Sequence, residues 1–220
     1  MKVITLDKQT SMNNLPISMK KDLSPPCVGR PRCFDPEEAL EKAMQVFWKQ
    51  GYEGTSLSDL TEAMGINRPS LYATFGNKEA LFVKVMDRYS AGPVAYVLDS
   101  LNEPTVKKVI EKLFADAVSL FADPDLPRGC MGIQGVLCGS KETASVVENV
   151  RARRVATQKK MAERFERGIQ EGDLPSSVNA EDLARHLVII LNGLSIQASN
   201  GACREELKRA VGFALQSLPF

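Results

Sequence analysis

The chain has 220 residues, and its 28 Lys and Arg residues against 27 Asp and Glu residues give a formal net charge of +1. A hydrophobic share of 44% at this length excludes wholesale disorder, because it can build a buried core in one or two domains. The longest uncharged stretch holds several polar side chains, so we expect no membrane association, and five cysteines, an odd number, favour a reducing cytoplasm over a secreted disulfide scaffold.

The first 28 residues predict a disordered tail, since they show no sustained hydrophobic periodicity and contain a Pro25-Pro26 pair. The next four residues, Gly29-Arg30-Pro31-Arg32, form a short basic arm that proline holds extended.

From this point the chain predicts helices and no strand, so we expect an all-α protein of about nine helices. The first helix begins after Asp35, a good N-cap, with Pro36 at the first helical position and Glu38 completing a pattern like a capping box. Gly51 is expected to end this helix. Its apolar face repeats at helical spacing through Ala39, Leu40, Ala43, Met44, Phe47 and Trp48.

Two short helices follow, with a glycine between them. Ser56 and Asp59 predict the start of the first one, and Gly65 supplies the backbone freedom that a tight turn needs. Asn67 is expected to cap the second one, at 68–74. A short helix, a tight turn and another short helix are typical of a helix-turn-helix unit.

A longer fourth helix is expected from its cap, Asn77, to about Leu98. Clusters of Pro and Gly separate the elements that follow. Five more helices are expected at about 105–122, 130–138, 141–171, 180–200 and 204–217.

The second helix of a helix-turn-helix unit enters the major groove of DNA. Here Arg68 can make a bidentate contact to guanine, and Tyr72 or Thr74 can bond phosphate. Lys78 begins the next helix, where backbone N–H groups and an ammonium suit a phosphate. The alternative for Tyr72 is packing in the core, because it stands at core spacing with its apolar neighbours.

The basic arm fits the same interpretation. Arg30 and Arg32 can reach an adjacent minor groove, and the alternative is a solvated linker that carries two arginines. The acidic residues Glu37, Glu38 and Glu41 must then face away from the duplex.

Three stretches of this region have motif character: Thr55-Ser56-Leu57-Ser58-Asp59-Leu60, Ala63-Met64-Gly65-Ile66-Asn67 and Leu71-Tyr72-Ala73-Thr74-Phe75-Gly76-Asn77-Lys78-Glu79-Ala80-Leu81. Their most specific elements are Leu-Tyr-x-x-Phe and Lys-Glu-x-Leu. Together they resemble the TetR/AcrR family of bacterial repressors, over about Arg32 to Leu81.

The resemblance implies a homodimer that binds a palindromic double-stranded DNA operator and leaves it when a small-molecule inducer shifts the fourth helix. It implies a DNA-binding unit at 29–77 and a ligand-binding and dimerisation domain at 78–220. Carried over by position, the DNA-facing residues are Arg68, Pro69, Ser70, Tyr72, Thr74 and Lys78, with Thr55 and Ser56 near phosphates. The second helix of the unit also offers Asn67 to the DNA.

The helix expected at 180–200 is apolar on nearly all sides, so one side can face its own domain and the other a partner subunit. The resemblance places a four-helix dimer interface on this helix and the last one; the alternative is a monomeric core. His186 is expected to be a hydrogen-bonded core or interface residue. The expected interface residues are Leu187, Ile190, Leu191, Leu194, Val211 and Leu215.

Residues 128–138 contain three glycines, each of which costs roughly 1 kcal/mol against alanine in a helix. Cys130 stands near the expected helix start, where the helix dipole lowers the pKa of a thiol. The simpler interpretation of Cys130 is a small buried hydrophobe, and the alternative is a thiol that senses oxidants or electrophiles.

An inducer pocket is expected between the helices of the larger domain, and its apolar lining predicts a small hydrophobic or aromatic ligand. The arginines and lysines of the helix at 141–171 are interpreted as a solvated face, with contacts to an acidic ligand as the alternative. The candidate lining residues are Phe82, Met86, Tyr89, Phe114, Val118, Phe121, Met131, Gln134, Met161, Phe165 and Asn192.

Other functional classes find little support. No nucleophile–base pair, paired carboxylates, phosphate loop or metal-ligand spacing stands out, so we expect neither an enzyme, nor a cofactor, nor a metal. A helical interaction protein whose helix-turn-helix unit does not bind DNA remains the alternative from another class.

Overall fold

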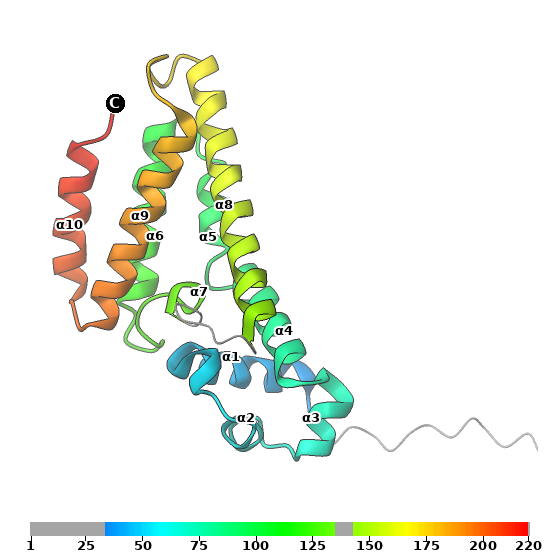
Figure 1. Cartoon of the computed structure of the whole chain (residues 1–220). Helices are drawn as coiled ribbons and strands as arrows, with labels where there is room; N and C mark the ends of the chain where they lie inside the picture. Colours follow the sequence, from blue (N-terminus) through cyan, green and yellow to red (C-terminus); the bar gives the residue numbers. More distant parts are fainter. Residues whose placement is uncertain (1–33, 135–142, 220) are drawn as a thin grey trace, which may run out of the picture. The chain divides into compact units, whose positions relative to one another are not determined.

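The computed structural model describes residues 34–134 and 143–219, and in these ranges every regular element is a helix (Figure 1). The prediction of an all-α fold is therefore confirmed. Residues from Phe34 onward belong to one compact unit. The helices are α1 (Pro36–Gly54), α2 (Leu57–Met64), α3 (Arg68–Phe75), α4 (Lys78–Ala91), α5 (Tyr96–Ser100), α6 (Val106–Phe121), α7 (Met131–Gln134), α8 (Ala144–Gln170), α9 (Ala180–Ser199) and α10 (Arg204–Gln216).

Helix α1 begins where the sequence predicts, but it ends later. The Asp35 side chain accepts a hydrogen bond from the Glu37 N–H at 2.9 Å, and Pro36 occupies the first turn. Gly51 has φ 72°, which breaks the helical geometry there, and the chain then resumes one more turn to Gly54. The prediction that Gly51 ends the helix is thus wrong, because the glycine only interrupts it.

The caps of α2 and α3 are as predicted. Ser56 and Asp59 form a reciprocal capping box, with bonds of 2.8 and 3.1 Å between side chains and backbone N–H groups. Gly65 ends α2 in the left-handed conformation at φ 67°, which an L side chain rarely adopts. The Asn67 side chain accepts a bond from the Ser70 N–H at 2.8 Å. These local bonds fix the turn between the two helices.

Helix α4 ends at Ala91, well before the predicted Leu98. Gly92 leaves the helical region at ψ −99°, and Pro93 follows it without an N–H to continue the ladder. A short turn then leads into α5, an element that the sequence did not indicate separately. The later helices α6, α8, α9 and α10 agree with their predicted spans within a few residues, while the predicted 130–138 and 141–171 helices run partly outside the described residues.

Two hydrophobic clusters hold the described residues together. The first joins α1–α4 to α7 and the start of α8, through side chains such as Trp48, Leu71, Tyr89 and Met131. The second joins α6, α8, α9 and α10. Helix α4 contributes to the first cluster along its whole length, so the short helix-turn-helix helices and the long helices share a packed boundary.

The buried Arg164 ties α8 to the turn between α5 and α6. Its guanidinium donates to the backbone carbonyls of Leu101, Glu103 and Pro104 at 2.9 to 3.3 Å. These carbonyls lie at or just beyond the C-terminal end of α5, where unpaired acceptors collect. In the described residues, no helix is long and apolar enough to span a membrane.

Candidate DNA-binding surface and ligand cavity

Helix α3 buries one face and offers the other to solvent. Leu71 and Phe75 are buried in the first cluster. Arg68, Pro69 and Tyr72 are exposed, and the Tyr72 side chain is 48% exposed in spite of its size. The open alternative of core packing for Tyr72 is therefore wrong. Ser70 and Thr74 are half-buried at the edges of this face.

The Arg68 guanidinium is positioned by α2. One Nη2–H donates to the Ser58 hydroxyl at 3.0 Å, and no carboxylate within 4 Å pairs with Arg68 among the described residues. Its remaining donors are free to form a bidentate contact with a base or a phosphate. Ser58 stands inside a motif quoted from the sequence, but only the fold shows that it supports Arg68.

Lys78 is less free than the sequence suggests. Its Nζ lies 4.4 Å from the centre of the Tyr52 ring, in cation–π geometry, and the side chain is half-buried. Burial lowers the pKa of Lys78, against the opposing effects of Glu53 and Asp59. The ammonium therefore stays at the start of α4, where the backbone N–H groups also point outward.

The two hydroxyls predicted near phosphates are both used in local structure. The Thr55 side chain is only 2% exposed, and its hydroxyl donates to the Gly51 carbonyl at 2.6 Å. The prediction of a phosphate contact by the Thr55 side chain is thus contradicted by its burial. Ser56 is exposed, with its oxygen accepting the cap bond described above. Arg30 and Arg32 lie outside the described residues.

The acidic side chains of α1 are neutralised from α4. Arg88 donates to Glu37 through Nη1 and to Glu41 through Nε, each at 2.7 Å. Glu38 pairs with Lys42 on the same helix at 2.7 Å. These pairs hold the three carboxylates, which were expected to face away from DNA, to cations of α1 and α4.

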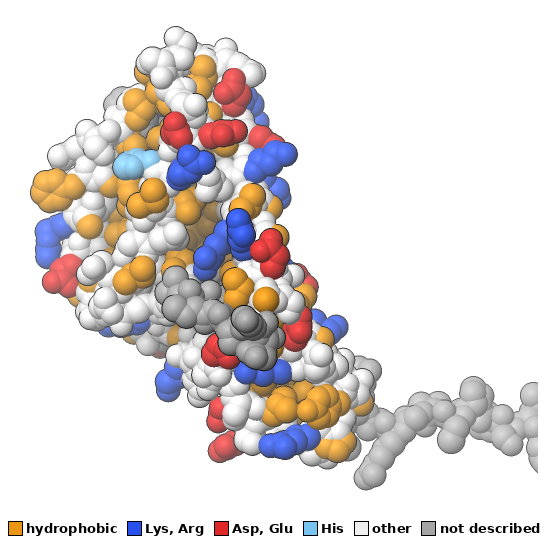
Figure 2. All heavy atoms as spheres, viewed as in Figure 1, with side chains coloured by type: hydrophobic (Ala, Val, Ile, Leu, Met, Phe, Trp, Pro, Cys, Tyr) orange, Lys and Arg blue, Asp and Glu red, His pale blue; other side chains and the backbone are white. Residues whose placement is uncertain are grey.

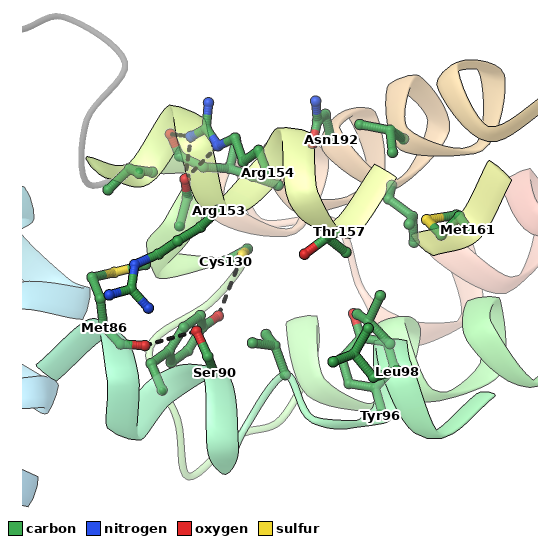
Figure 3. A pocket seen from close by; sticks show the side chains of 18 of the residues that line it. Met86, Ser90, Tyr96, Leu98, Cys130, Arg153, Arg154, Thr157, Met161 and Asn192 are labelled. Carbon is green, nitrogen blue, oxygen red and sulfur yellow. Dashed lines mark hydrogen bonds between the residues drawn. The ribbon is translucent and has the colours of Figure 1, made fainter. Parts of the chain in front are cut away.

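A cavity of about 190 Å³ is lined by residues of α4, α5, α6, α7, α8 and α9 (Figure 3). Five of the predicted ligand residues line it: Met86, Tyr89, Phe121, Met161 and Asn192. The rest of the wall comes from residues the sequence did not single out for it. Among these are Ser90, Tyr96, Val97, Leu98, Cys130, Thr157 and Val188. Arg153 and Arg154 also line the cavity, and they belong to the basic residues for which contacts to an acidic ligand were the alternative interpretation.

The other six predicted ligand residues do not line this cavity. Phe82 and Met131 are buried in the first cluster, and Phe114, Val118 and Phe165 are buried in the second. Gln134 faces a separate polar hollow, where it bonds the Ser199 hydroxyl. An apolar side chain on an inward face can fill a core or line a cavity, and the sequence pattern does not separate the two.

The residues Gly129–Met131, here called the linking segment, join several helices by hydrogen bonds. Trp48 Nε1–H of α1 donates to the Gly129 carbonyl at 3.2 Å. The Cys130 N–H donates to the Ser195 hydroxyl of α9 at 2.8 Å, and the Met131 N–H donates to the Tyr89 hydroxyl of α4 at 3.2 Å. The linking segment thus contacts both the helix-turn-helix core and the cavity wall.

The prediction of a lowered pKa for Cys130 is wrong. Burial raises the pKa of the thiol, and this effect outweighs the hydrogen bond that the Tyr89 hydroxyl donates to Sγ at 3.3 Å. Helix α7 has only four residues in the described range, so its dipole is small. The simpler interpretation, a small buried hydrophobe, agrees with this geometry.

The expected dimer residues lie mostly inside the chain. Leu187, Leu191 and Leu194 are buried in the second cluster, and Ile190, Val211 and Leu215 are half-buried. The exposed apolar side chains of α9 and α10 are instead Ile189, Ile196 and Phe213, the last being 76% exposed. Where a dimer interface lies on these two helices stays a prediction.

Hydrophobic side chains gather over α9 and α10 on the face that Figure 2 shows. The only histidine of the chain, His186, is exposed among them, so it is not a core residue, and the interface position that was also expected for it stays a prediction. No group of three or more metal-ligating side chains occurs in the described ranges.

An exposed recognition helix on a capped helix-turn-helix unit, packed against further helices, is typical of DNA-binding transcriptional regulators. Comparison with known proteins agrees. Residues 39–85 match the sequence model for bacterial regulatory proteins of the tetR family. Residues 107–214 match the model for the tetracyclin repressor-like C-terminal domain.

The HTH-type transcriptional repressor ComR of Escherichia coli is 35% identical over 193 residues, which cover 87% of this chain and 92% of ComR. A cysteine-substituted form of the TetR-family regulator CifR, in complex with 26-base-pair operator DNA, is 40% identical with a TM-score of 0.84. That match covers 86% of this chain and all of the CifR chain. The chain belongs to the TetR family and is a DNA-binding transcriptional repressor, in a family of regulators and not of enzymes.

Proposed function

We propose that this repressor binds a palindromic operator as a homodimer and is released from it by a small inducer that occupies the cavity. The observation that carries the proposal is the position of α4. The first residue of this helix, Lys78, adjoins α3, and its last turns supply Met86, Tyr89 and Ser90 to the cavity wall. A ligand that moves those last turns also moves the support of the recognition helix.

On the DNA side, we assign base contacts to the exposed face of α3. The Arg68 guanidinium has N–H donors that are not used in its bond to Ser58, and Pro69 and Tyr72 are exposed beside it. Ser70, Thr74, Ser56 and Lys78 border this face and are proposed to bond phosphates. The arm with Arg30 and Arg32 is proposed to enter the minor groove from the unit at 29–77.

A homodimer is supported by the apolar face of α9 and α10. Ile189, Ile196 and Phe213 are too large and too exposed to be explained by the fold of one chain. A Cβ added at Gly193 or Gly212 would meet nothing within 4 Å, so these glycines let a second pair of helices approach closely. The larger domain at 78–220 would then carry the inducer cavity and the dimer contacts, and the protein would act in the cytoplasm.

The linking segment supplies a second route between cavity and DNA. Cys130 lines the cavity, while the neighbouring Gly129 carbonyl accepts the Trp48 bond from α1. A ligand that pushes the segment would therefore act on the helix-turn-helix core directly. The alternative of an electrophile-sensing thiol at Cys130 gains no support from this geometry, because burial raises its pKa and leaves little reactive thiolate.

The experiment is the selection of duplex DNA from a random pool by the purified protein at fixed salt. Three forms are compared: the natural protein, Arg68→Ala, and the control Arg167→Ala. The control removes the same charge at an exposed position of α8, outside the helix-turn-helix unit. We expect a palindromic site that Arg167→Ala retains and Arg68→Ala loses. A recovered site without two-fold symmetry, or one that Arg68→Ala still selects, would overturn the proposal.

A further inference from the structure

The charged side chains that line the cavity are all positive. Its described lining contains two arginines, Arg153 and Arg154, and neither an Asp nor a Glu. Arg153 is already paired, because its Nη2 lies 2.7 Å from the Asp87 carboxylate. Arg154 has no carboxylate partner among the described residues, and within them its hydrogen bonds go to neutral carbonyls. The cavity wall therefore carries one uncompensated positive charge.

The Arg154 side chain is held in place without being neutralised. Its Nε donates to the Gly132 carbonyl at 2.9 Å, and its Nη2 donates to the carbonyls of Gly132 and Ile133 (Figure 3). Nη1 has no partner among the described residues, so two N–H donors remain. The Arg154 side chain is exposed, although partial burial still lowers its pKa. An anion beside it would form charge-assisted bonds with the remaining donors.

The side chains of α8 that line the cavity change from polar to apolar along the helix. Arg154, Thr157 and Met161 follow each other at spacings of three and four residues, so they share one face of the helix. In Figure 3 the Thr157 hydroxyl points toward Cys130. No hydrogen bond joins this hydroxyl to another of the described residues. In Figure 3 Met161 and Leu98 lie at the far end from Arg154, next to Tyr96. Most of the other lining side chains, such as Val97 and Val188, are apolar.

The cavity volume limits the size of an occupant. An apolar cavity of roughly 150 Å³ holds benzene. The cavity here, at about 190 Å³, holds a single ring or a short alkyl chain with one small head group. Larger multi-ring ligands would need the walls to move apart.

We propose that this cavity binds a small monocarboxylate, with the carboxylate on Arg154 and Thr157 and the apolar body between Met161, Leu98 and Val188. The inference rests on the proposed function in one respect only: the same cavity is the inducer site. Charge-assisted bonds from a guanidinium to a carboxylate are about twice as strong as neutral ones, so the acid is preferred over a neutral molecule of equal shape.

The test measures binding through Trp48, the only tryptophan, whose Nε1–H bonds the linking segment beside the cavity. Benzoate is compared with benzyl alcohol, and hexanoate with hexanol, by titration of tryptophan emission at pH 7 and fixed salt. Isothermal calorimetry repeats each titration. We expect each acid to bind about tenfold or more tightly than its alcohol.

The variants are Arg154→Gln, Arg154→Lys and the control Arg151→Gln. Arg151 lies three residues earlier on α8, is exposed, and pairs with Glu148 at 3.7 Å without lining the cavity. Arg154→Gln should lose the preference for acids, Arg154→Lys should keep part of it, and Arg151→Gln should match the natural protein. Thermal melts followed by circular dichroism establish that each variant is folded.

The outcomes separate this inference from the proposed function. Equal affinity for acid and alcohol, an acid preference that Arg154→Gln retains, or no binding of any probe would each overturn the monocarboxylate assignment. Acids that bind through Arg154 but leave operator affinity unchanged would support the assignment while contradicting the inducer role of the cavity. Acids that bind through Arg154 and weaken operator binding support both.

Discussion

The recognition surface and the cavity are built in opposite ways. The surface on α3 is set by bonds that span a few residues, such as the Ser56–Asp59 capping box and the Asn67 cap. The cavity is assembled from six helices, and its support includes bonds between residues far apart in the chain, such as Trp48 with Gly129 and Cys130 with Ser195. A substitution in the first region should act locally, whereas one at the linking segment should disturb several helices at once.

The largest effect is expected at Gly129. Its φ is 82°, and a Cβ there would lie 2.8 Å from the Ser195 carbonyl oxygen and closer still to the side chains of Gln134 and Ser199. Gly129→Ala should therefore cost about 2–4 kcal/mol of unfolding free energy, measured by urea denaturation. The control Gly54→Ala meets only an ordinary contact, at 3.8 Å from the Gln50 Cβ, and should change stability by less than about 1 kcal/mol. Equal effects of the two substitutions would contradict the role of the linking segment.

The next effect concerns the apolar face of α9 and α10. Phe213→Ser removes the most exposed large hydrophobic side chain and should shift the protein from dimer to monomer in analytical ultracentrifugation. Val155→Ser, at a side chain 61% exposed on α8, provides the comparison and should leave the dimer intact. A dimer that survives Phe213→Ser unchanged would place the interface elsewhere.

A smaller effect is expected in the reactivity of two thiols, Cys130 at the cavity and the exposed Cys203. Because burial raises the pKa of Cys130, its thiolate fraction at pH 7.5 is small and grows only at more alkaline pH. We expect iodoacetamide to modify exposed Cys203 about tenfold or more faster than Cys130, as followed by peptide mass spectrometry. Faster modification of Cys130 at pH 7.5 would revive the sensing alternative.

The smallest effect is expected in the helix-turn-helix unit. Ser56→Ala removes the N-cap of α2 and should cost about 1 kcal/mol of unfolding free energy. Ser56→Thr keeps a capping hydroxyl and should recover most of that loss. A cost for Ser56→Ala as large as that of Gly129→Ala would break the contrast between local and long-range construction.

The contrast between local and long-range construction also explains which features could be predicted from the sequence. Caps and glycine turns are encoded within a few residues, so the starts of α2 and α3 and the left-handed Gly65 were predicted correctly. Helical spacing likewise accounts for the burial of Leu71 and Phe75 on one face of α3.

Features that depend on distant partners were predicted less well. The burial of Thr55, the core positions of Phe114 and Phe165, and the roles of Arg154 and Thr157 are set by which helix packs where. The exposed face of α9 was missed for the same reason, because nearly every side of that helix is apolar in sequence. No local signal in α8 marks which of its arginines reaches a cavity.

The most direct test of the coupling between cavity and recognition surface needs no ligand. Thr157→Phe places a ring in the cavity, and Val155→Phe adds the same ring on the exposed side of α8. Affinity for the selected operator is measured by fluorescence anisotropy at fixed salt, with folding checked by circular dichroism. The account predicts about fivefold or more weaker operator binding for Thr157→Phe, within the usual range of allosteric coupling, and no change for Val155→Phe. A folded Thr157→Phe protein that binds the operator as tightly as the natural protein would contradict it.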